Sequence, residues 1–399
     1  MITTVQSGIT AVGYIDWAVR DFHGYDTQRG STYNSYLLKF EKTALIDTVK
    51  EPYATDLLMN LVRAGVAPDS VDYVVVNHAE PDHSGALPAL LPLLPNATVV
   101  CNKKTQEILG AYYNTAKWNF QLVKTGDTLS LGDGKTLQFI EVPMVHWPDS
   151  MVTYLQEEQI LFSNDAFGQH YATSRRFDDE NDLATLLFEA KSYYANIVNP
   201  YSKRVAAVLA GLANVPMKMI CPSHGVIWRA HIPEIVAAYQ GWAAQRMLPK
   251  VTILFDSMWH RTERMVTAIQ EGVASVPGVL LEVLPVRAAT LNQLATAAID
   301  TACFALGSST LNQQMMPQMA ATICYLQGLN FPGRAAFAFG SHGWGKGGPE
   351  LLSAKIAEMR WTETQAPIVA KFEPTAEILS QCTEAGKALA QKALELAGQ

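Results

Sequence analysis

The stretch His78-Ala79-Glu80-Pro81-Asp82-His83 places two imidazoles and two carboxylates within six positions, directly after the apolar run Val71–Val76. The apolar run predicts a buried strand, so the polar side chains come where that strand ends. Pro81 disfavours the helical region at the preceding residue, and we therefore expect a tight, non-helical loop that aims all four side chains at one place. Histidines and carboxylates gathered in this way are typical of a metal site.

Three further candidate ligands each follow an apolar run farther along the chain. They are His146 in Val142-Pro-Met-Val-His146-Trp-Pro-Asp149-Ser150, Asp165 in Ser163-Asn-Asp165-Ala-Phe-Gly-Gln-His170, and His224 in Ser223-His224-Gly225. A lone histidine is more often a hydrogen-bonded loop residue, and a lone aspartate more often caps a turn. Side chains at successive strand ends meet at one edge of a sheet, however, so the cluster at 78–83 strengthens the case for all three.

Composition limits the classes of function. The chain has 399 residues, of which 49% are hydrophobic and 17% charged, with a net charge of −7. The length suggests two or three domains, each able to bury a sizeable core. A negative net charge argues against nucleic acid as the main partner, because phosphate binding needs a basic face.

Nothing in the sequence indicates secretion or a membrane. The N-terminus has no basic segment followed by an apolar one, and no stretch approaches the roughly 20 apolar residues that span a bilayer. The five cysteines (Cys101, Cys221, Cys303, Cys324 and Cys382) are scattered and form no Cys-x-x-Cys pair. We expect reduced thiols and a cytoplasmic protein.

The first part of the chain, to about residue 248, is rich in short strand-like runs with helical stretches between them. The expected strands are Tyr33–Leu38, Thr43–Ile46, Val71–Val76, Thr98–Cys101, Leu137–Val142, Met151–Leu155, Ile160–Phe162 and Met217–Ile220, and the clearest expected helices are Tyr53–Arg63 and Leu183–Val198. This mixture predicts two sheets covered by helices.

After Pro249 the pattern changes to a fivefold alternation of apolar runs and helix-length segments. The runs are Val251–Phe255, Leu280–Leu284, Cys303–Leu306, Ala335–Phe339 and Ile368–Phe372. Such an alternation predicts a doubly wound parallel sheet. We therefore place a domain boundary between residues 248 and 249, giving domains 1–248 and 249–399.

Three loops follow strands of this second domain. Asp256–Glu263 opens a helix and offers backbone N–H groups to a phosphate, although Thr262 could simply cap that helix. Gly307-Ser-Ser-Thr310-Leu-Asn312 and Gly340-Ser-His-Gly-Trp344-Gly-Lys-Gly-Gly348 follow the third and fourth strands. Open α/β sheets bind ligands at the carboxyl ends of their strands, and Trp344 offers a flat apolar face to a ring system.

The first domain resembles the metallo-β-lactamase superfamily. The order His-x-Glu-x-Asp-His, His146, Asp165 and Ser-His-Gly carries this resemblance, while zinc hydrolases of the superfamily have histidine where this chain has Glu80. That substitution is similar to the flavodiiron proteins, and the strings Asn77–Ala86, His146–Met151 and Ser163–Tyr171 agree with them.

The resemblance implies a metal set and an activity. His78, Glu80 and His146 would hold one iron, Asp82, His83 and His224 the other, and Asp165 would bridge the pair. Three carboxylates supply about −3 against +4 for two ferrous ions, and oxygen ligands suit iron that cycles between oxidation states. The family reduces dioxygen to water or nitric oxide to nitrous oxide, with no catalytic side chain expected beyond the ligands. Asp149 is a candidate partner for His146, and Trp147, His170, Tyr193 and Tyr194 are candidate walls.

The second domain resembles flavodoxin, which binds flavin mononucleotide (FMN). By this resemblance, Ser257–Thr262 would hold the phosphate, and the later loops would flank the flavin ring. The expected FMN-binding residues are Ser257, Met258, Trp259, His260, Arg261, Thr262, Ser308, Ser309, Thr310, Leu311, Asn312, Ser341, His342, Gly343, Trp344, Gly345, Lys346, Gly347 and Gly348. Arg261 and Lys346 stand where other residue types are common, and their roles stay open. The fold class expected overall is an αββα metallo-β-lactamase-like sandwich followed by a flavodoxin-like parallel sheet.

The same resemblance implies partners. The family pairs one chain's flavin with the other chain's irons, so we expect a head-to-tail homodimer or a tetramer. The paired Cys-x-x-Cys motifs of a rubredoxin module are not seen, so electrons are expected from a separate rubredoxin or another reductase, including a deazaflavin-dependent route.

Two other interpretations stay open. The chain could be a zinc hydrolase fused to a flavodoxin, which metal analysis would distinguish. It could also be a non-catalytic electron carrier, although all seven ligand positions are filled. The sequence does not separate dioxygen from nitric oxide as substrate.

Overall fold

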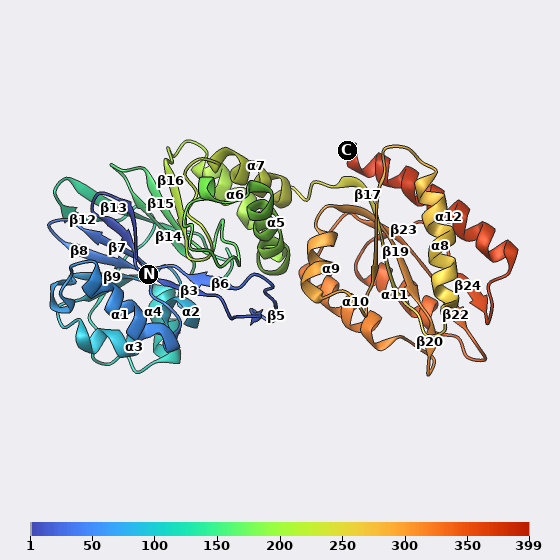
Figure 1. Ribbon diagram of the computed structural model, residues 1–399, viewed down its shortest axis with the longest axis horizontal. Coiled ribbons are helices and arrows are strands. Elements are labelled where there is room, and N and C mark those ends of the chain that lie inside the picture. The colour runs from blue at the N-terminus through green and yellow to red at the C-terminus, as the bar shows by residue number, and fades with distance from the viewer. Residues whose placement is uncertain (1, 399) are drawn as a thin grey trace. The chain divides into compact units, whose positions relative to one another are not determined.

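The computed structural model describes residues 2–398, which divide into two compact units. The first unit runs to Tyr193 and continues over Lys203–Gln240, while the second takes Tyr194–Ser202 and the chain from Gly241 onward. Each unit has its own sheets and its own core (Figure 1).

The first unit contains two large sheets. One has the strand order β1-β2-β7-β8-β9-β10-β11, and the other has the order β12-β13-β14-β15-β16. The first sheet is built from β1 Thr3–Gln6, β2 Ile9–Ala11, β7 Tyr36–Lys39, β8 Thr43–Ile46, β9 Tyr73–Val75, β10 Thr98–Cys101 and β11 Phe120–Leu122. The second is built from β12 Thr128–Gly132, β13 Lys135–Glu141, β14 Met151–Leu155, β15 Ile160–Asn164 and β16 Met219–Pro222. Two small ladders pair β3 Tyr14–Asp16 with β6 Ser31–Tyr33 and β4 Asp21–Phe22 with β5 Tyr25–Asp26.

The two sheets share one apolar core. Leu38 and Ile46 of the first sheet belong to the same buried cluster as Leu137, Phe139 and Phe162 of the second. Alternate residues of a strand point to opposite faces, so each sheet also turns an apolar face outward, and that face requires a covering layer.

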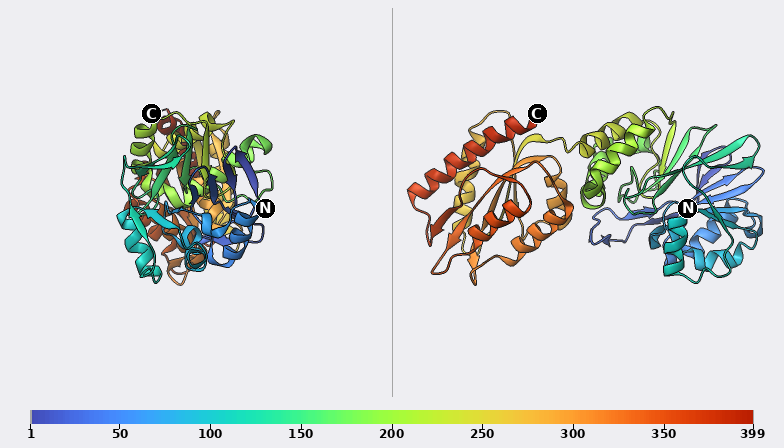
Figure 2. Two further views of the ribbon diagram at one scale, coloured as in Figure 1. Left: turned by 90° about the vertical axis from the view of Figure 1, so that its left-hand side faces the viewer. Right: turned by 180° about the vertical axis from the view of Figure 1, so that it is seen from behind.

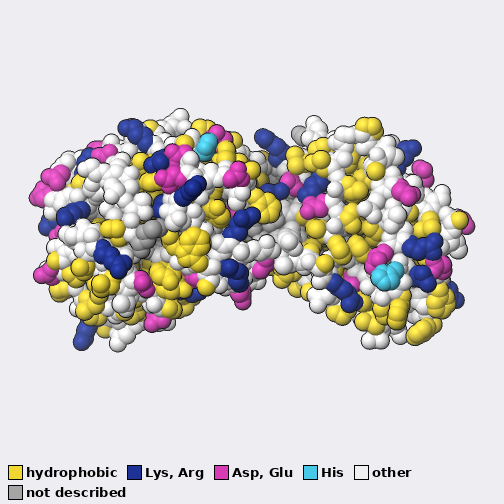
Figure 3. Space-filling model, in the orientation of Figure 1, with side chains coloured by type: hydrophobic (Ala, Val, Ile, Leu, Met, Phe, Trp, Pro, Cys, Tyr) yellow, Lys and Arg dark blue, Asp and Glu magenta, His cyan; other side chains and the backbone are white. Residues whose placement is uncertain are grey.

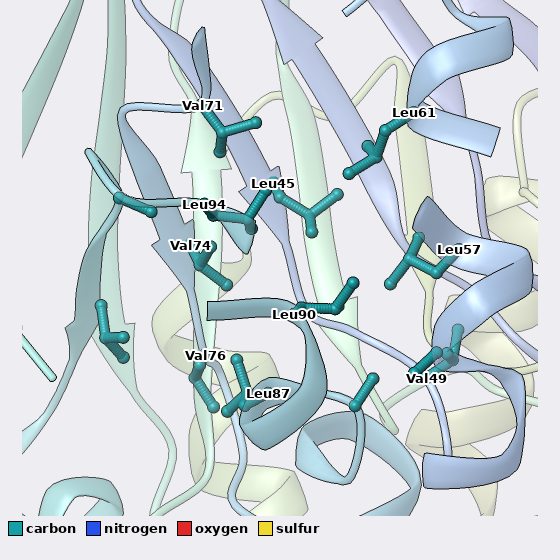
Figure 4. Close-up of a cluster of buried hydrophobic side chains, with 14 of the residues drawn as sticks. Leu45, Val49, Leu57, Leu61, Val71, Val74, Val76, Leu87, Leu90 and Leu94 are labelled. Carbon is teal, nitrogen blue, oxygen red and sulfur yellow. The ribbon is translucent and has the colours of Figure 1, made fainter. Parts of the chain in front are cut away.

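Helices provide that covering. They are α1 Ala54–Arg63, α2 Pro81–Ser84, α3 Leu87–Leu90 and α4 Lys103–Tyr112 beside the first sheet, and α5 Leu183–Tyr193, α6 Ser202–Leu212 and α7 Ile232–Ala243 beside the second (Figure 1). Figure 4 shows Leu57 and Leu61 of α1 and Leu90 of α3 gathered with Leu45 and Val74 of the strands. The order helix, sheet, sheet, helix confirms the αββα class expected from the sequence.

The second unit is a parallel sheet with the order β18-β17-β19-β22-β23, in which β24 also pairs with β22. Its strands are β17 Leu248–Asp256, β18 Leu280–Pro285, β19 Thr301–Ser308, β22 Ala335–His342, β23 Thr362–Glu363 and β24 Ile368–Lys371, with a hairpin of β20 Thr310–Leu311 and β21 Gln314–Met315. Its helices are α8 Arg261–Ala274, α9 Leu291–Ala298, α10 Pro317–Leu329, α11 Gly348–Glu358 and α12 Ala376–Ala397. Helices α8 and α12 lie together on one face of the sheet, and α9, α10 and α11 lie on the other (Figures 1 and 2). The flavodoxin-like doubly wound sheet is confirmed.

Three local predictions differ from the structure. The expected strand Tyr33–Leu38 is two strands, because Asn34 and Ser35 turn the chain and bond to Pro222 and Asp47. The expected helix Leu183–Val198 is α5 followed by a π-helical turn over Tyr194–Val198. The loop after Glu80 is a helical turn, α2, which begins at Pro81; Glu80 itself is extended with φ −56° and ψ 141°. Proline is well tolerated in the first turn of a helix while the residue before it stays extended, which explains this arrangement.

The surface carries charges of both signs. On the face drawn in Figure 3, Lys and Arg side chains are interspersed with Asp and Glu on each unit. Within residues 2–398, no helix has both the length and the apolar character that a membrane crossing requires.

Candidate functional site

The metal-site candidates of the first unit lie at one edge of its two sheets. His78 follows β9, His146 follows β13, Asp165 follows β15 and His224 follows β16. Strands β13 and β15 are both antiparallel to β14, and β16 is parallel to β15. Strands β13, β15 and β16 therefore run in the same direction. Their carboxyl ends therefore share one edge, and α2 adds Asp82 and His83 from the first sheet.

All seven predicted ligands come together, in two groups. His78, Glu80, His146 and Asp165 form one group of nearby ligand atoms, and Asp82, His83 and His224 form another. In the first group Glu80 Oε2 lies 3.1 Å from His78 Nε2 and 3.2 Å from His146 Nε2. In the second, Asp82 Oδ2 lies 3.3 Å from His83 Nε2 and 3.1 Å from His224 Nε2.

Asp165 faces both groups with different oxygens. Its Oδ2 lies 3.4 Å from His146 Nε2 and 3.8 Å from His78 Nε2, in the first group. Its Oδ1 lies 3.1 Å from His83 Nε2 and 3.3 Å from His224 Nε2, in the second. A carboxylate placed in this way has the geometry of a bridge between two cations.

The candidate metal-binding atoms are buried, and many of them lack a hydrogen-bond partner among the described residues. Both carboxylate oxygens of Asp82, Oδ2 of Asp165 and Nε2 of His146 and His224 are of this kind. Buried polar groups are normally paired, so several orphaned atoms that converge in one pocket fit a cation that they would share.

Electrostatics supports the same conclusion. Burial alone would lower the pKa of His224, but its interactions with Asp165 and Asp82 outweigh burial and raise the pKa to about 10. Burial opposes the shift at His146 also, and Asp165 and Glu80 raise its pKa to about 9. Three carboxylates thus draw protons onto the histidines, and a divalent cation would replace those protons.

Partners outside the groups fix two of the imidazole rings. His78 Nδ1 lies 3.1 Å from Asp149 Oδ1, and His224 Nδ1 donates to the Thr32 carbonyl at 2.6 Å. Asp149 therefore pairs with His78, whereas its short sequence separation had suggested His146. Such partners fix the tautomer so that Nε2 faces the site.

The aromatic candidates divide between the two units. Trp147 contacts the His78 ring at 4.9 Å, His170 lies 5.2 Å from the His224 ring, and Tyr193 donates its hydroxyl proton to Asp165 Oδ1 at 2.9 Å. Tyr194 instead belongs to the second unit and contacts Trp242, so the sequence interpretation of it as a wall is not supported.

Sequence reasoning missed His23. It lies between β4 and β5, with Nε2 3.5 Å from Glu80 Oε1 and 3.8 Å from Asp82 Oδ2, and neither ring nitrogen has a hydrogen-bond partner among residues 2–398. Phe22 stacks on its ring at 4.0 Å. The sequence signal for His23 was weak, because it consisted only of the aromatic pair Phe22-His23 before Gly24. In the structure these residues form a turn, in which His23 and Gly24 have φ of 55° and 79°.

The segment after this hairpin is tied to α5 by an ion pair that gives a pH prediction. Arg29 Nε lies 2.9 Å from Glu189 Oε1, yet burial raises the pKa of Glu189 to about 7 from 4.5. The folded chain then binds this proton more tightly than the unfolded one, so the associated stability is present below pH 4.5 and is lost as the pH rises through 7. The upper bound of this effect is about 3 kcal/mol.

We therefore expect Glu189→Gln to lose less thermal stability than the native protein between pH 5 and pH 8, measured as the change in Tm. Asp179→Gln, at an exposed ion pair with Arg229, is the control and should follow the native protein. An identical pH response of Glu189→Gln and the native protein would contradict the expectation.

The second unit has a cavity of about 780 Å³ at the carboxyl ends of its strands. The predicted residues that line it are Met258, Trp259, Arg261, Ser309, Thr310, Leu311, Asn312, Ser341, His342, Gly343, Trp344 and Gly345. Gln313, Phe372 and Glu373 also line it and were not predicted. The predicted residues outside the lining are Ser257, His260, Thr262, Ser308, Lys346, Gly347 and Gly348.

Several features of this cavity fit a flavin phosphate and ring. Helix α8 begins with no side-chain cap, which leaves its first N–H groups available, and the buried Ser257 hydroxyl has no partner among the described residues. Thr262 lies underneath, within 2.9 Å of Ser309 and 3.0 Å of Ser341 through their hydroxyl oxygens. Trp344 lines the cavity and is 97% exposed, so its aromatic face is accessible for stacking on a flavin ring.

Arg261 faces the cavity and pairs with Glu373. Its Nε lies 2.7 Å from Glu373 Oε2, and Arg264 approaches the same carboxylate. The sequence left the role of Arg261 open; in the structure its side chain is held by a neighbouring carboxylate at the cavity wall. Lys346 does not line the cavity.

Comparisons with known proteins agree with these two sites. Residues 32–225 match the family described as "ODP family beta lactamase". The anaerobic nitric oxide reductase flavorubredoxin of Salmonella arizonae is 40% identical over 397 residues, covering 98% of this chain and 82% of that protein. An Escherichia coli protein of the same name is 41% identical over the same shares.

Solved structures extend the match to the whole fold. The flavodiiron protein of Giardia intestinalis has a TM-score of 0.96 and 38% identity, covering 100% of this chain and 98% of that one. The rubredoxin oxygen:oxidoreductase of Desulfovibrio gigas has a TM-score of 0.96 and 36% identity over the full length of both chains. With its two groups of ligands joined by one carboxylate and its flavodoxin-like second unit, this chain belongs to the flavodiiron protein family.

Proposed function

We propose that this protein reduces nitric oxide, dioxygen or both at a pair of iron ions that receives electrons from FMN. The observation that carries the proposal is the bridging geometry of Asp165, whose two oxygens face two separate groups of histidines. The family carries FMN and a non-haem di-iron centre, and named relatives include a nitric oxide reductase and an oxygen:oxidoreductase. When bound, two ferrous ions supply electrons and adjacent positions for a diatomic gas, and FMN replenishes those electrons.

The chain's own residues would bind the two irons, orient the binding rings and form the walls of the site. His78, Glu80 and His146 would hold one iron, and Asp82, His83 and His224 the other. Asp149 and the Thr32 carbonyl keep two of the rings, His78 and His224, oriented with Nε2 towards the site, where these atoms would hold iron. His23 lies beside this set with neither ring nitrogen paired among residues 2–398, so it can donate a hydrogen bond toward a bound gas, whereas Tyr193 donates its proton to Asp165.

The FMN site would use the three loops of the second unit. The N-terminus of α8 and the Ser257 hydroxyl would hold the phosphate, and the loops at Ser309–Asn312 and Ser341–Gly345 would flank the ring. The other residues predicted from the sequence, including Gly347 and Gly348, would act by shaping the loop backbone: Gly347 has φ 153°, and a side chain there would meet the Gln313 backbone.

Trp344→Ala is expected to weaken FMN binding at least about fivefold, because a stacked aromatic face contributes roughly 1 kcal/mol beyond its buried area. The measurement is quenching of FMN fluorescence as apoprotein is titrated. Trp17→Ala, an exposed tryptophan of the first unit, is the matched control and should bind FMN as the native protein does. Unchanged affinity in Trp344→Ala would remove this residue from the site.

The activity itself is tested with gas electrodes. Anaerobic protein with reduced FMN should consume nitric oxide, dioxygen or both, and contain about two irons per chain. The zinc hydrolase is the second candidate function, favoured by the match to a β-lactamase-like family. Stoichiometric zinc in a preparation that hydrolyses an ester or amide, with no gas consumption, would establish that alternative instead.

Assembly, donor, location and domain limits are parts of the same proposal. We propose a head-to-tail homodimer or tetramer, fed in trans by a rubredoxin or another reductase; the name of the Desulfovibrio gigas relative supports the donor. An active protein that sediments as a monomer would contradict the assembly.

Free cysteines throughout residues 2–398 support a cytoplasmic protein. We place the functional domains at 1–248 and 249–399.

A further inference from the structure

Three tyrosine rings in contact run from the surface of the first unit towards its metal site. Tyr14 stacks on Tyr53 with centroids 3.8 Å apart and planes 12° apart, and Tyr53 lies 5.5 Å from Tyr33. Tyr33 is fully buried, whereas Tyr14 and Tyr53 are half-buried. Strands β3 and β6 hold the two ends in register, because Tyr14 pairs directly opposite Tyr33.

The inner end of this row is joined to a proposed iron ligand in two ways. The Tyr33 ring lies 6.2 Å from the His224 ring. His224 also donates from Nδ1 to the carbonyl of Thr32, which is one peptide bond from Tyr33. These two contacts provide a short path along which an electron could pass between Tyr33 and His224.

A single buried carboxylate, that of Asp16, accepts hydrogen bonds from two of the phenols. Tyr53 and Tyr33 both donate to Asp16 Oδ2, at 2.7 and 3.3 Å. Asp16 Oδ1 accepts from the N–H groups of Ala18 and Val19, which fixes the carboxylate in place. Packing alone does not call for a carboxylate between aromatic rings, because burying its charge is costly. Burial and the charge of Asp16 keep the pKa of Tyr53 above its usual value, so the phenol keeps its proton at neutral pH.

We propose that Tyr33, Tyr53 and Tyr14 form a relay that carries oxidising equivalents from the iron pair to the protein surface. The inference rests on the proposed reduction of dioxygen. Dioxygen needs four electrons to become water, and two ferrous ions supply only two. When FMN is already oxidised, partly reduced oxygen would remain as an oxidant beside the buried histidines. The relay gives that oxidant an electron from the solvent side.

Each transfer balances. One electron leaves the Tyr33 phenol for the oxidant, and the phenol proton passes to Asp16, which leaves a neutral tyrosyl radical. Tyr53 then returns an electron to Tyr33, while Asp16 returns its proton to Tyr33 and takes that of Tyr53. Tyr14 restores Tyr53 through their ring contact and releases its own proton to water, and Asp16 returns its proton to Tyr53. A one-electron reductant in solution, such as a reduced flavin or a thiol, restores Tyr14 together with a proton from water.

The nearby charge explains the need for Asp16. Lys50 Nζ lies 5.9 Å from the Tyr33 ring centroid and 4.9 Å from that of Phe22. A positive charge at that distance disfavours a tyrosine radical cation. Oxidation of Tyr33 is therefore feasible only when the proton leaves with the electron, and Asp16 is the acceptor within hydrogen-bond distance.

The experiment uses the full chain, loaded with ferrous iron and oxidised FMN. It is mixed with dioxygen and, in parallel, with hydrogen peroxide, and samples are frozen rapidly for electron paramagnetic resonance. The native protein should give a tyrosyl radical that narrows with ring-deuterated tyrosine. Tyr33→Phe should reduce the signal to background, and Tyr53→Phe should prolong it by trapping the radical on Tyr33. Phenylalanine keeps the packing, and iron and FMN contents confirm that each variant is folded and loaded.

Two controls make the result specific. Tyr154→Phe removes a buried phenol that donates to the Pro216 carbonyl, outside the row, and should leave the signal unchanged. Tyr193→Phe tests the rival phenol at Asp165. A radical that survives Tyr33→Phe and disappears in Tyr193→Phe would overturn the relay, as would fully iron-loaded native protein that forms no tyrosyl radical with either oxidant. Gas electrodes record the proposed function separately, because a protein that consumes neither gas would still be oxidised in the peroxide arm.

Discussion

Asp165→Asn is expected to lower bound iron from about two ions per chain to fewer than one, and gas reduction to background. The native carboxylate offers one oxygen to each group of histidines, at 3.1–3.4 Å from His83, His146 and His224. Asparagine keeps the size but has one oxygen, no charge and an N–H₂ that would point at one group. That group would lose its bridge and gain a donor where a cation belongs, so neither iron would be held as part of a pair.

The charge balance makes the effect large. The site has three carboxylates, Glu80, Asp82 and Asp165, around four histidines. Asp165 is 1% exposed, so losing its charge removes about a third of the negative charge that offsets two divalent cations, in surroundings where little water can compensate.

Iron is measured by elemental analysis and the activity by gas electrodes, on protein whose FMN content confirms an intact second unit. Asp179→Asn is the matched control, because this aspartate lies in an exposed ion pair with Arg229 and should leave iron and activity unchanged. Asp165→Asn with native iron content and rate would show that Asp165 is not a bridge.

Asp47→Ala is expected to destabilise the first unit by about 3–5 kcal/mol and to reduce iron binding with it. Asp47 is buried at the end of β8, and its carboxylate accepts from the backbone N–H of Asn77 at 2.8 Å and from the side chain of Asn77 at 3.0 Å. It also accepts from the side chain of Asn164 at 3.2 Å. Asn77 and Asn164 directly precede the ligands His78 and Asp165, so one carboxylate fixes two ligand loops.

Removing that carboxylate leaves the backbone N–H and the side-chain amide of Asn77 without an acceptor, and each costs about 1–3 kcal/mol. Asn164 loses one of its two acceptors and keeps Ser223 Oγ at 3.1 Å. Asp47→Asn should be nearly as harmful, because its N–H₂ group would meet other donors. Glu107→Ala is the control: this exposed glutamate of the first unit pairs with Lys104, and such pairs contribute about 1 kcal/mol or less.

Urea unfolding followed by circular dichroism measures the stability, and FMN fluorescence reports the second unit separately. Native stability and iron content in Asp47→Asn would show that the two ligand loops do not depend on this carboxylate.

The two variants differ in what they test. Asp165→Asn alters a residue that the sequence pattern itself singled out, by its place after an apolar run and by the family resemblance. Nothing in the sequence singled out Asp47, since a lone aspartate after a strand is an ordinary turn residue. Its importance comes from contacts with Asn77 and Asn164, which lie 30 and 117 positions away in the chain.

The fold class, the seven candidate ligands and the loops of the flavin cavity could be predicted from residue patterns together with the family resemblance. Periodicity marks strands such as Thr43–Ile46 and Met151–Leu155, whose bounds agree with the structure, because burial on sheet faces imposes a local pattern. The stretch at 78–83 predicts a metal site because its two histidines and two carboxylates lie within six positions of the sequence. Three sets of contacts became visible only in the folded chain: Asp149 with His78, His23 with Glu80 and Asp82, and the tyrosine row beside Asp16. These contacts join residues that no local pattern connects, and their partners are chosen by how the strands and loops pack.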